Sequence, residues 1–152
     1  MTPKSLLRNP QVTSTLDDLA TGQFEVVLDE VSSLNKQQVE RVILCSGKVY
    51  YDLLEMREKE NIKGVAIVRL EQFYPVCKKK LTELYTSYGA KEWIWVQEEP
   101  KNMGAWQFVC ANLDFIPFSC VSRDASASTA VGNSKLHAKE QQALLEQALK
   151  IS

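Results

Sequence analysis

The chain has 152 residues, of which 45% are hydrophobic and 24% are charged, and its formal net charge is −1. This length and composition are typical of one folded domain that buries a core without a metal or a disulfide to hold it together. The chain has 18 basic and 19 acidic side chains. Because these charges nearly cancel, no overall electrostatic field attracts nucleic acid or an anionic membrane, and neither partner is expected.

The cysteines are spread along the chain without a C-x-x-C pair, at Cys45, Cys77, Cys110 and Cys120. We expect free thiols, because a chain of this size without a secretory signal keeps its cysteines reduced as small apolar packing groups. The first ten residues contain no apolar stretch of signal-peptide length, and no later stretch is long enough to span a bilayer. A cytoplasmic location is therefore predicted.

The first 38 residues are predicted to form an arm that precedes the main domain. Pro3, Pro10 and Gly22 interrupt the pattern there, which leaves one short capped helix over 14–20 and one strand over 24–28. The arm is too poor in apolar residues to make a core alone. We therefore expect it to lie over the body of the domain or over another subunit.

Short apolar segments alternate with amphipathic ones from residue 39 to residue 152. The predicted strands are 41–45, 64–70, 93–96 and 117–123. The predicted helices are 49–59, 81–88, 102–115 and 135–150, the last with Ser134 as its cap. This alternation indicates an α/β domain over 39–152, with a mainly parallel sheet and helices on both faces, because right-handed crossovers place them there.

Ser46, Gly47 and Lys48 follow a predicted strand and open a predicted helix. Free backbone N–H groups and the helix dipole could receive a phosphate there, with Lys48 as the counter-charge. The spacing matches neither G-x-x-x-x-G-K-[ST] nor G-x-G-x-x-G, and a tight turn with a solvated lysine is the competing interpretation. With Arg123 as a further cation, Ser46 and Lys48 make a candidate anion site for a nucleotide or coenzyme A effector.

Glu98 and Glu99 follow the strand over 93–96, at the edge of an open α/β sheet where ligands are usually met. Adjacent side chains diverge on an extended segment, so acid–base chemistry by this pair is disfavoured. We expect one carboxylate to cap the helix that follows, or to pair with a base such as Arg69 or Arg123.

Few other residues are candidates for a catalytic or metal-binding role. His137 is the only histidine, which excludes sites with several histidine ligands, and Ser126 and Ser128 lack a G-x-S-x-G elbow. No catalytic, cofactor-binding or metal-binding residue is therefore predicted. Aromatic residues at loop–helix junctions can anchor a subunit interface. Together with the polar residues near them, the predicted interface residues are Phe73, Tyr74, Glu98, Glu99, Asn102 and Trp106.

Several blocks of sequence occur in an order that matches a known family. The blocks are CSGKVYYDL at 45–53, VRLEQFYP at 68–75, QEEPKNMGAW at 97–106, and SAS at 126–128 followed by Gly132 and His137. They resemble the C-terminal region of the thiamine-diphosphate-dependent, decarboxylating component of 2-oxoglutarate dehydrogenase. Asp124 and Thr129 stand where the family pattern has proline.

The resemblance implies a fold of the transketolase C-terminal type. This fold is a three-layer α/β/α domain with a mainly parallel five-stranded sheet and one antiparallel strand. In that family the lobe supports subunit assembly, and in some members it binds a nucleotide or acetyl-CoA effector. The family binds thiamine diphosphate and Mg²⁺ through Gly-Asp-Gly and Asn-Asn motifs, and this sequence contains neither.

The resemblance also implies a function for a larger parent enzyme. That enzyme is a thiamine-diphosphate-dependent oxidoreductase of the tricarboxylic acid cycle, which decarboxylates 2-oxoglutarate and succinylates a lipoyl-lysine. This fragment alone would be inactive. Its implied partners are the upstream domains, the second subunit of a homodimer and the lipoyl-bearing succinyltransferase. An effector-binding module and a stand-alone α/β interaction domain are the alternatives.

Overall fold

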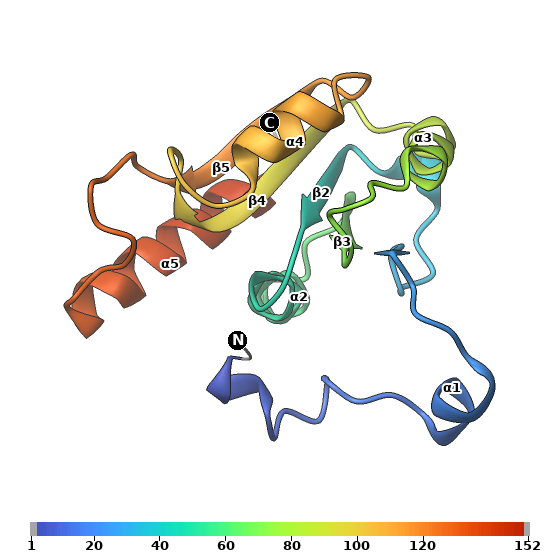
Figure 1. Ribbon diagram of the computed structural model, residues 1–152, viewed down its shortest axis with the longest axis horizontal. Coiled ribbons are helices and arrows are strands. Elements are labelled where there is room, and N and C mark those ends of the chain that lie inside the picture. Colours follow the sequence, from blue (N-terminus) through green and yellow to red (C-terminus); the bar gives the residue numbers. More distant parts are fainter. Residues whose placement is uncertain (1–2, 151–152) are drawn as a thin grey trace.

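The computed structural model describes residues 3–150 of the chain. They build a five-stranded sheet in the order β1-β3-β2-β4-β5, with helices on both faces (Figure 1). The strands are β1 (Val27–Leu28), β2 (Arg41–Cys45), β3 (Val65–Leu70), β4 (Glu92–Pro100) and β5 (Phe118–Arg123). The α-helices are α1 (Leu16–Thr21), α2 (Val49–Lys59), α3 (Lys78–Ser87), α4 (Trp106–Asn112) and α5 (Ser134–Leu149). Two short 3₁₀ helices are η1 (Lys4–Leu6) and η2 (Lys36–Gln38).

The central strand β2 is buried along its whole length, as expected for a strand covered on both faces. It pairs in parallel with both neighbours, so that Ile43 lies opposite Ile67 of β3 and Ile94 of β4. At one edge, β1 runs antiparallel to β3, with Val27 opposite Leu70. The predicted mainly parallel α/β sheet with one antiparallel strand is thus confirmed.

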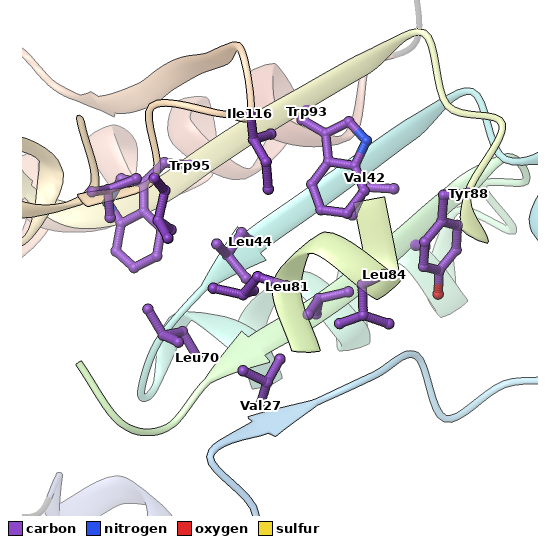
Figure 2. Close-up of a cluster of buried hydrophobic side chains, with 14 of the residues drawn as sticks. Val27, Val42, Leu44, Leu70, Leu81, Leu84, Tyr88, Trp93, Trp95 and Ile116 are labelled. Atoms are coloured by element: carbon purple, nitrogen blue, oxygen red, sulfur yellow. The ribbon is translucent and has the colours of Figure 1, made fainter. Parts of the chain in front are cut away.

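Alternate residues of β2 face two separate cores, because successive side chains of a strand point to opposite faces. Val42 and Leu44 belong to the core beneath α3 and α4, whereas Ile43 and Cys45 belong to the core beneath α2 and α5. Figure 2 shows the first of these cores, in which Trp95 packs with only 1% of its surface exposed. The three-layer arrangement follows from this division.

Strand β4 is longer than predicted, and helix α4 is shorter. The sequence predicts a strand that ends at Val96, but β4 continues to Pro100 past an irregularity in its pairing with β5. The helix predicted to begin at residue 102 begins instead at Trp106, because residues 101–104 form a turn in which Gly104 has a φ of +67°. The stretch predicted as a loop is therefore the end of a strand followed by a tight turn.

The cap of α5 also differs from the prediction by one residue. Asn133 Oδ1 accepts hydrogen bonds from the backbone N–H groups of Lys135 and Leu136, at 2.9 and 3.1 Å. Ser134, the predicted cap, is the first residue of the helix. Both residue types are favoured at this position, so the pattern alone does not separate them.

The N-terminal part contains the expected short helix and a shorter strand than expected. Helix α1 is closed by a capping box in which the side chains of Thr15 and Asp18 each accept a hydrogen bond from the other's backbone N–H, at 3.1 and 3.0 Å. The strand predicted over 24–28 is reduced to β1, since its partner β3 ends at Leu70. β1 lies inside the predicted arm of residues 1–38 yet joins the sheet, and the domain boundary at residue 38 stays a prediction.

A buried ion pair ties the chain after β1 to helix α2. Arg57 Nη1 lies 2.6 Å from Glu30 Oε2, and their side chains are 8% and 4% exposed. Glu30 also accepts the backbone N–H of Ile67 at 2.8 Å, while Arg57 donates to the carbonyl of Val65 at 3.0 Å. Burial raises the pKa of Glu30, but the hydrogen bonds, led by that from Arg57, outweigh it and hold the pKa below 4.5.

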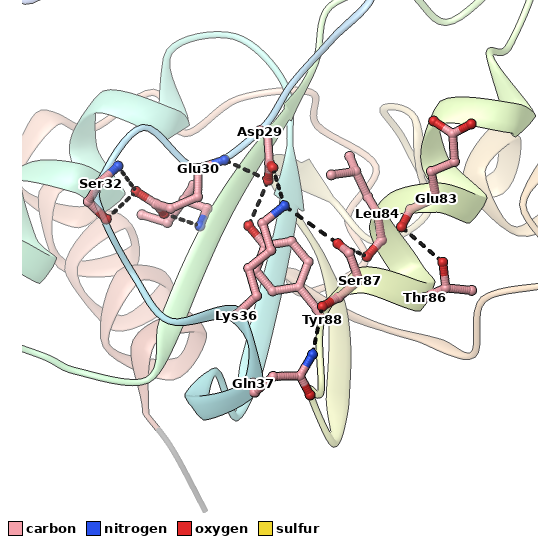
Figure 3. Close-up of polar contacts among 11 residues, drawn as sticks. Asp29, Glu30, Ser32, Lys36, Gln37, Glu83, Leu84, Thr86, Ser87 and Tyr88 are labelled. Carbon is pink, nitrogen blue, oxygen red and sulfur yellow. Dashed lines mark hydrogen bonds and ion pairs between the residues drawn. The ribbon is translucent and has the colours of Figure 1, made fainter.

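The neighbouring Asp29 joins the same segment to helix α3 (Figure 3). Its two carboxylate oxygens bind the ammonium of Lys36 and the hydroxyl of Tyr88, each at 2.6 Å. Lys36 also lies over the ring of Tyr88, 4.7 Å from its centroid. Residues 26–38 are thus held to the body by polar contacts as well as by the β1 ladder.

No helix within residues 3–150 is both long enough and apolar enough to cross a membrane. All four cysteines are free. Burial raises the pKa of the Cys45 thiol, whereas Cys110 is exposed on α4.

Candidate functional site

The polar residues singled out in the sequence gather at the carboxyl edge of the sheet. Strands β2, β3, β4 and β5 are parallel, so the segments that follow Cys45, Leu70, Pro100 and Arg123 leave the sheet on the same side. Ligands and partners usually meet an open α/β sheet at this edge. The geometry of each segment decides what it can do.

Gln97 organises the end of β4, although its side chain is only 3% exposed. Its Oε1 accepts hydrogen bonds from Trp95 Nε1 and from the backbone N–H of Trp106, both at 2.9 Å. Its Nε2 donates to the carbonyls of Met103 at 2.7 Å and Pro100 at 3.1 Å. One amide therefore joins the end of β4 to the start of α4 across the segment 97–106, termed here the Gln97 turn.

Gly104 completes the Gln97 turn in a way that other residues would not. Its φ of +67° is a left-handed conformation that favours glycine. A Cβ at this position would also lie 3.0 Å from three side-chain atoms of Gln97. The turn thus requires a glycine both for its backbone and for the close approach of the amide.

Asn102 joins the Gln97 turn to the loop that follows β5. Its Oδ1 accepts the backbone N–H of Ser126, and its Nδ2 donates to the carbonyl of the same residue, both at 3.0 Å. Lys101 N–H adds a third bond, to the carbonyl of Arg123 at 2.9 Å. Asn102, predicted as an interface residue near a helix start, therefore holds the Ser126 loop in place.

Lys48 lies between two carboxylates at the start of α2. It pairs with Asp52, one turn along the helix, and with Glu98 at 3.1 Å. Burial lowers the pKa of Lys48, but the two carboxylates outweigh it and raise the pKa above 10.5, so the ammonium stays charged. One of Glu98 and Glu99 was expected to cap a helix or to pair with a base such as Arg69 or Arg123. Glu98 does pair with a base, which is Lys48.

Arg123 is held at the end of β5 by residues of α5. One guanidinium nitrogen donates to Gln141 at 3.1 Å and lies 3.2 Å from His137 Nδ1. Gln141 also donates to Asp52 at 2.9 Å, which links Arg123 to Lys48 through side chains of two helices. The two predicted anion-binding cations therefore belong to one network, whose positive charges already face carboxylates.

The aromatic residues predicted for an interface differ in their exposure. Phe73 packs edge-on against Trp95 and Phe108, with ring centroids 6.0 and 5.7 Å apart, and Trp106 is half-buried. Tyr74, in contrast, has 85% of its surface exposed. Glu99 is likewise exposed. Of the predicted interface residues, Tyr74, Glu99 and Asn102 are the exposed ones.

The family model described as "2-oxoglutarate dehydrogenase C-terminal" matches residues 13–149. The chain belongs to this family. The 2-oxoglutarate dehydrogenase E1 component of Azotobacter vinelandii is 44% identical over 99% of this chain, and that of Rickettsia felis is 47% identical over 98%. The matches cover 17% and 16% of these two relatives, so the chain spans about a sixth of their length.

A solved structure resembles the fold of this 2-oxoglutarate dehydrogenase C-terminal chain. It is the "Split gene transketolase, inactive beta4 tetramer", with a TM-score of 0.55 and 18% sequence identity. The alignment covers 84% of this chain and 44% of that one. The likeness shows the transketolase-type fold that the sequence predicts.

Sequence reasoning missed the residues that build this edge of the 2-oxoglutarate dehydrogenase C-terminal domain. Gln97 is absent from the predicted site, because a glutamine after an apolar run marks the end of a strand rather than a buried amide. The ion pair of Glu30 with Arg57 was also missed, since nothing in the sequence pairs two charges 27 positions apart. The signal for Gln97 was indirect: Gly104 and the two tryptophans frame a compact turn.

A cavity of about 540 Å³ lies between the loop after β5 and helix α5 of this family member. Arg123, Ser126 and Glu140 are among the polar residues that line it. Ser46 and Lys48 do not line it, so the structure does not bring the three predicted anion-binding residues to one cavity.

Proposed function

We propose that this chain is the C-terminal lobe of an enzyme that oxidatively decarboxylates 2-oxoglutarate and transfers a succinyl group to lipoyl-lysine in the tricarboxylic acid cycle. The family match over residues 13–149 carries this proposal, because relatives named 2-oxoglutarate dehydrogenase E1 component align with almost the whole chain. For the whole enzyme we keep the predicted homodimer, the cytoplasmic location and the lipoyl-bearing succinyltransferase as partner.

Thiamine diphosphate and Mg²⁺, the cofactors proposed for the whole enzyme, are assigned to the part of the protein outside this chain. Within residues 3–150 no three His, Cys, Asp or Glu side chains lie together as metal ligands would. Lys48 already pairs with two carboxylates, so it does not suit a diphosphate. In this proposal the chemistry belongs to the residues that hold the cofactors, and the lobe takes no step of it.

The lobe is proposed to act by presenting a contact surface to the rest of the enzyme. The Gln97 turn presents a rigid surface, because every polar group of Gln97 is satisfied within the chain. Rigid, preformed surfaces lose little entropy when they bind. Phe73, Glu98 and Trp106 support this surface from within, and Asn102 holds the Ser126 loop beside it. Tyr74 and Glu99 extend from it toward the upstream domains and the second subunit.

The decisive experiment uses the protein encoded together with its upstream sequence. We expect it to oxidise 2-oxoglutarate with ferricyanide as electron acceptor, and to depend on added thiamine diphosphate and Mg²⁺. The 152-residue chain alone should show no turnover, and calorimetry should detect no thiamine diphosphate binding to it. A folded long protein without this activity, or tight cofactor binding by the short chain, would overturn the proposal.

Tyr74 tests the positional role separately. In the long protein, Tyr74→Ala should shift sedimentation toward smaller species, because a large exposed aromatic side chain is a typical interface anchor. Leu136→Ala, which truncates another exposed apolar side chain on α5, is the matched control and should leave sedimentation unchanged. Identical sedimentation of the two variants and the unmodified protein would remove Tyr74 from the interface.

A second candidate, binding of a nucleotide or acetyl-CoA effector, is favoured by one observation at the cavity beside α5. The side chain of Arg123 is 10% exposed, and its Nε has no hydrogen-bond partner, while a carboxylate oxygen of Glu140 lies 3.7 Å away. The volume of about 540 Å³ suits a small ligand. AMP or acetyl-CoA at millimolar concentration should then raise the melting temperature. An unchanged melting temperature with both would remove this candidate.

A further inference from the structure

Residues 3–25, termed here the arm segment, expose apolar side chains instead of burying them. The large hydrophobic residues that are exposed in this segment are Leu7, Leu16, Leu19 and Phe24, with 66%, 84%, 74% and 68% of their surfaces accessible. Only three other large hydrophobic residues in the described chain are exposed: Val31, Tyr74 and Leu136. Single exposed apolar residues are ordinary, but a concentration of them in one short segment marks an interaction surface.

Helix α1 arranges two of these side chains on one face. Leu16 and Leu19 are three positions apart, so they are neighbours on the helix surface. Asp17 and Asp18 occupy the first turn, where negative charge is stabilising, and Asp18 closes the capping box with Thr15. The helix is therefore preformed, with an apolar face that has no covering partner within residues 3–150.

The polar contacts of the arm segment with the body lie at its carboxyl end. The hydrogen bonds of residues 3–22 stay within these residues, as far as the structure describes them. The first hydrogen bond or ion pair to the body is that of Glu25 with Lys80 at 2.6 Å. Figure 1 shows the arm segment, in dark blue, running clear of the sheet and its helices. The chain thus holds a structured apolar segment away from its own core.

The relatives indicate what covers this segment. The family match begins at residue 13 and so includes α1 and Phe24. The matched part is C-terminal by description and makes up 16–17% of the relatives, so in those proteins most of the chain precedes it. A segment joined directly to that preceding chain meets it at the high effective concentration of an intramolecular contact, which a second copy does not share.

We infer that the arm segment docks through Leu16, Leu19 and Phe24 onto the preceding part of the same polypeptide, as an amphipathic helix laid into an apolar groove. This inference rests on the proposed function, because it requires the longer E1 chain. It identifies residues 13–25 as the contact that fixes the lobe to the rest of the enzyme. The two acidic residues of α1 then face solvent.

Hydrogen–deuterium exchange tests the inference without reference to catalysis. Amides of residues 13–25 should exchange roughly tenfold or more slowly in the long protein than in the 152-residue chain, because docking closes a segment that otherwise opens freely. Equal exchange rates in the two proteins would overturn the inference. Since this readout needs no turnover, slow exchange in a long protein that does not oxidise 2-oxoglutarate would keep the docking and reject only the proposed activity.

A matched pair of variants locates the contact. Leu19→Lys in the long protein should remove most of the protection, because it puts a charge into the apolar contact. Thr21→Lys adds the same charge two residues away, on the opposite side of α1, and should retain the protection. Equal loss in both variants would contradict a contact made by the leucine face. Protection in the short chain that grows with its concentration would instead assign the contact to a second copy, and would also overturn the inference.

Discussion

The Gln97 turn and the arm segment differ in whether their side chains find partners within the chain. In the turn, the oxygen and the nitrogen of the buried Gln97 amide both find hydrogen-bond partners within ten residues. In the arm, Leu16 and Leu19 stay exposed although the helix that carries them is well capped. The difference separates side chains that find their partners within this chain from those that we propose to be covered by the rest of the enzyme.

The largest effect is expected from breaking the buried ion pair that joins the N-terminal part to the body. Glu30→Ala leaves Arg57 charged and buried, which costs about 3–5 kcal/mol in the free energy of unfolding. Urea denaturation of the 152-residue chain measures this loss. Glu60→Ala is the control, because that carboxylate is exposed and 3.9 Å from Lys59, so its removal should change little. Similar effects of the two variants would mean that the pair of Glu30 with Arg57 does not hold the fold.

Removing the amide of the Gln97 turn should come next. Gln97→Ala removes the hydrogen-bond partner of Trp95 Nε1, of the backbone N–H of Trp106 and of the Met103 carbonyl. We expect a loss of about 2–3 kcal/mol in the free energy of unfolding. Gln142→Ala, which deletes an exposed amide on α5, should stay within about 0.5 kcal/mol of the parent. A loss in Gln97→Ala no larger than in Gln142→Ala would show that water replaces these hydrogen bonds.

Acid should weaken the body through Glu30. Its pKa in the folded protein lies below the ordinary value of 4.5, so the unfolded state binds a proton first as the pH falls. The stability that Glu30 provides is complete above about pH 5 and is lost as the pH drops through its lowered folded pKa. Denaturation measured between pH 7 and pH 3 should therefore show a shallower acid loss in Glu30→Gln than in the parent. An unchanged pH dependence would contradict this assignment.

The smallest effect on the free energy of unfolding is expected in the arm segment. Leu16→Ser in the 152-residue chain should change the free energy of unfolding by no more than about 0.5 kcal/mol, because this leucine contacts no core. Val109→Ser, on the inner face of α4, is the buried counterpart and should cost several times more, since it leaves a hydroxyl in an apolar core. A large loss in Leu16→Ser would mean that the arm packs against the lobe after all.

Much of the fold could be predicted from the sequence, because its signals are local. The apolar run at 41–45 and the amphipathic segment at 49–59 coincide with β2 and α2. Alternation of such segments is enough to indicate a parallel sheet. The residues also predicted a strand over 24–28, but the resemblance to the family supplied what periodicity did not, namely a five-stranded sheet with one antiparallel strand.

The site was less accessible to prediction, because it depends on contacts between distant positions. Asn102 binds the backbone of Ser126, 24 positions away, and Lys48, which follows β2, pairs with Glu98 of the adjacent strand β4. Gln97 is buried although its residue type is usually exposed. A pattern of residue types does not contain these pairings, which arise only when the parallel strands bring their ends to one edge.

The Gln97 turn has a consequence for how the chain can vary in length. Beyond Val96 the backbone is positioned by the Gln97 side chain, whose partners Pro100, Met103 and Trp106 lie at fixed separations along the sequence. An inserted or deleted residue between 97 and 106 would move at least one partner out of reach. Family members should therefore keep this turn at constant length.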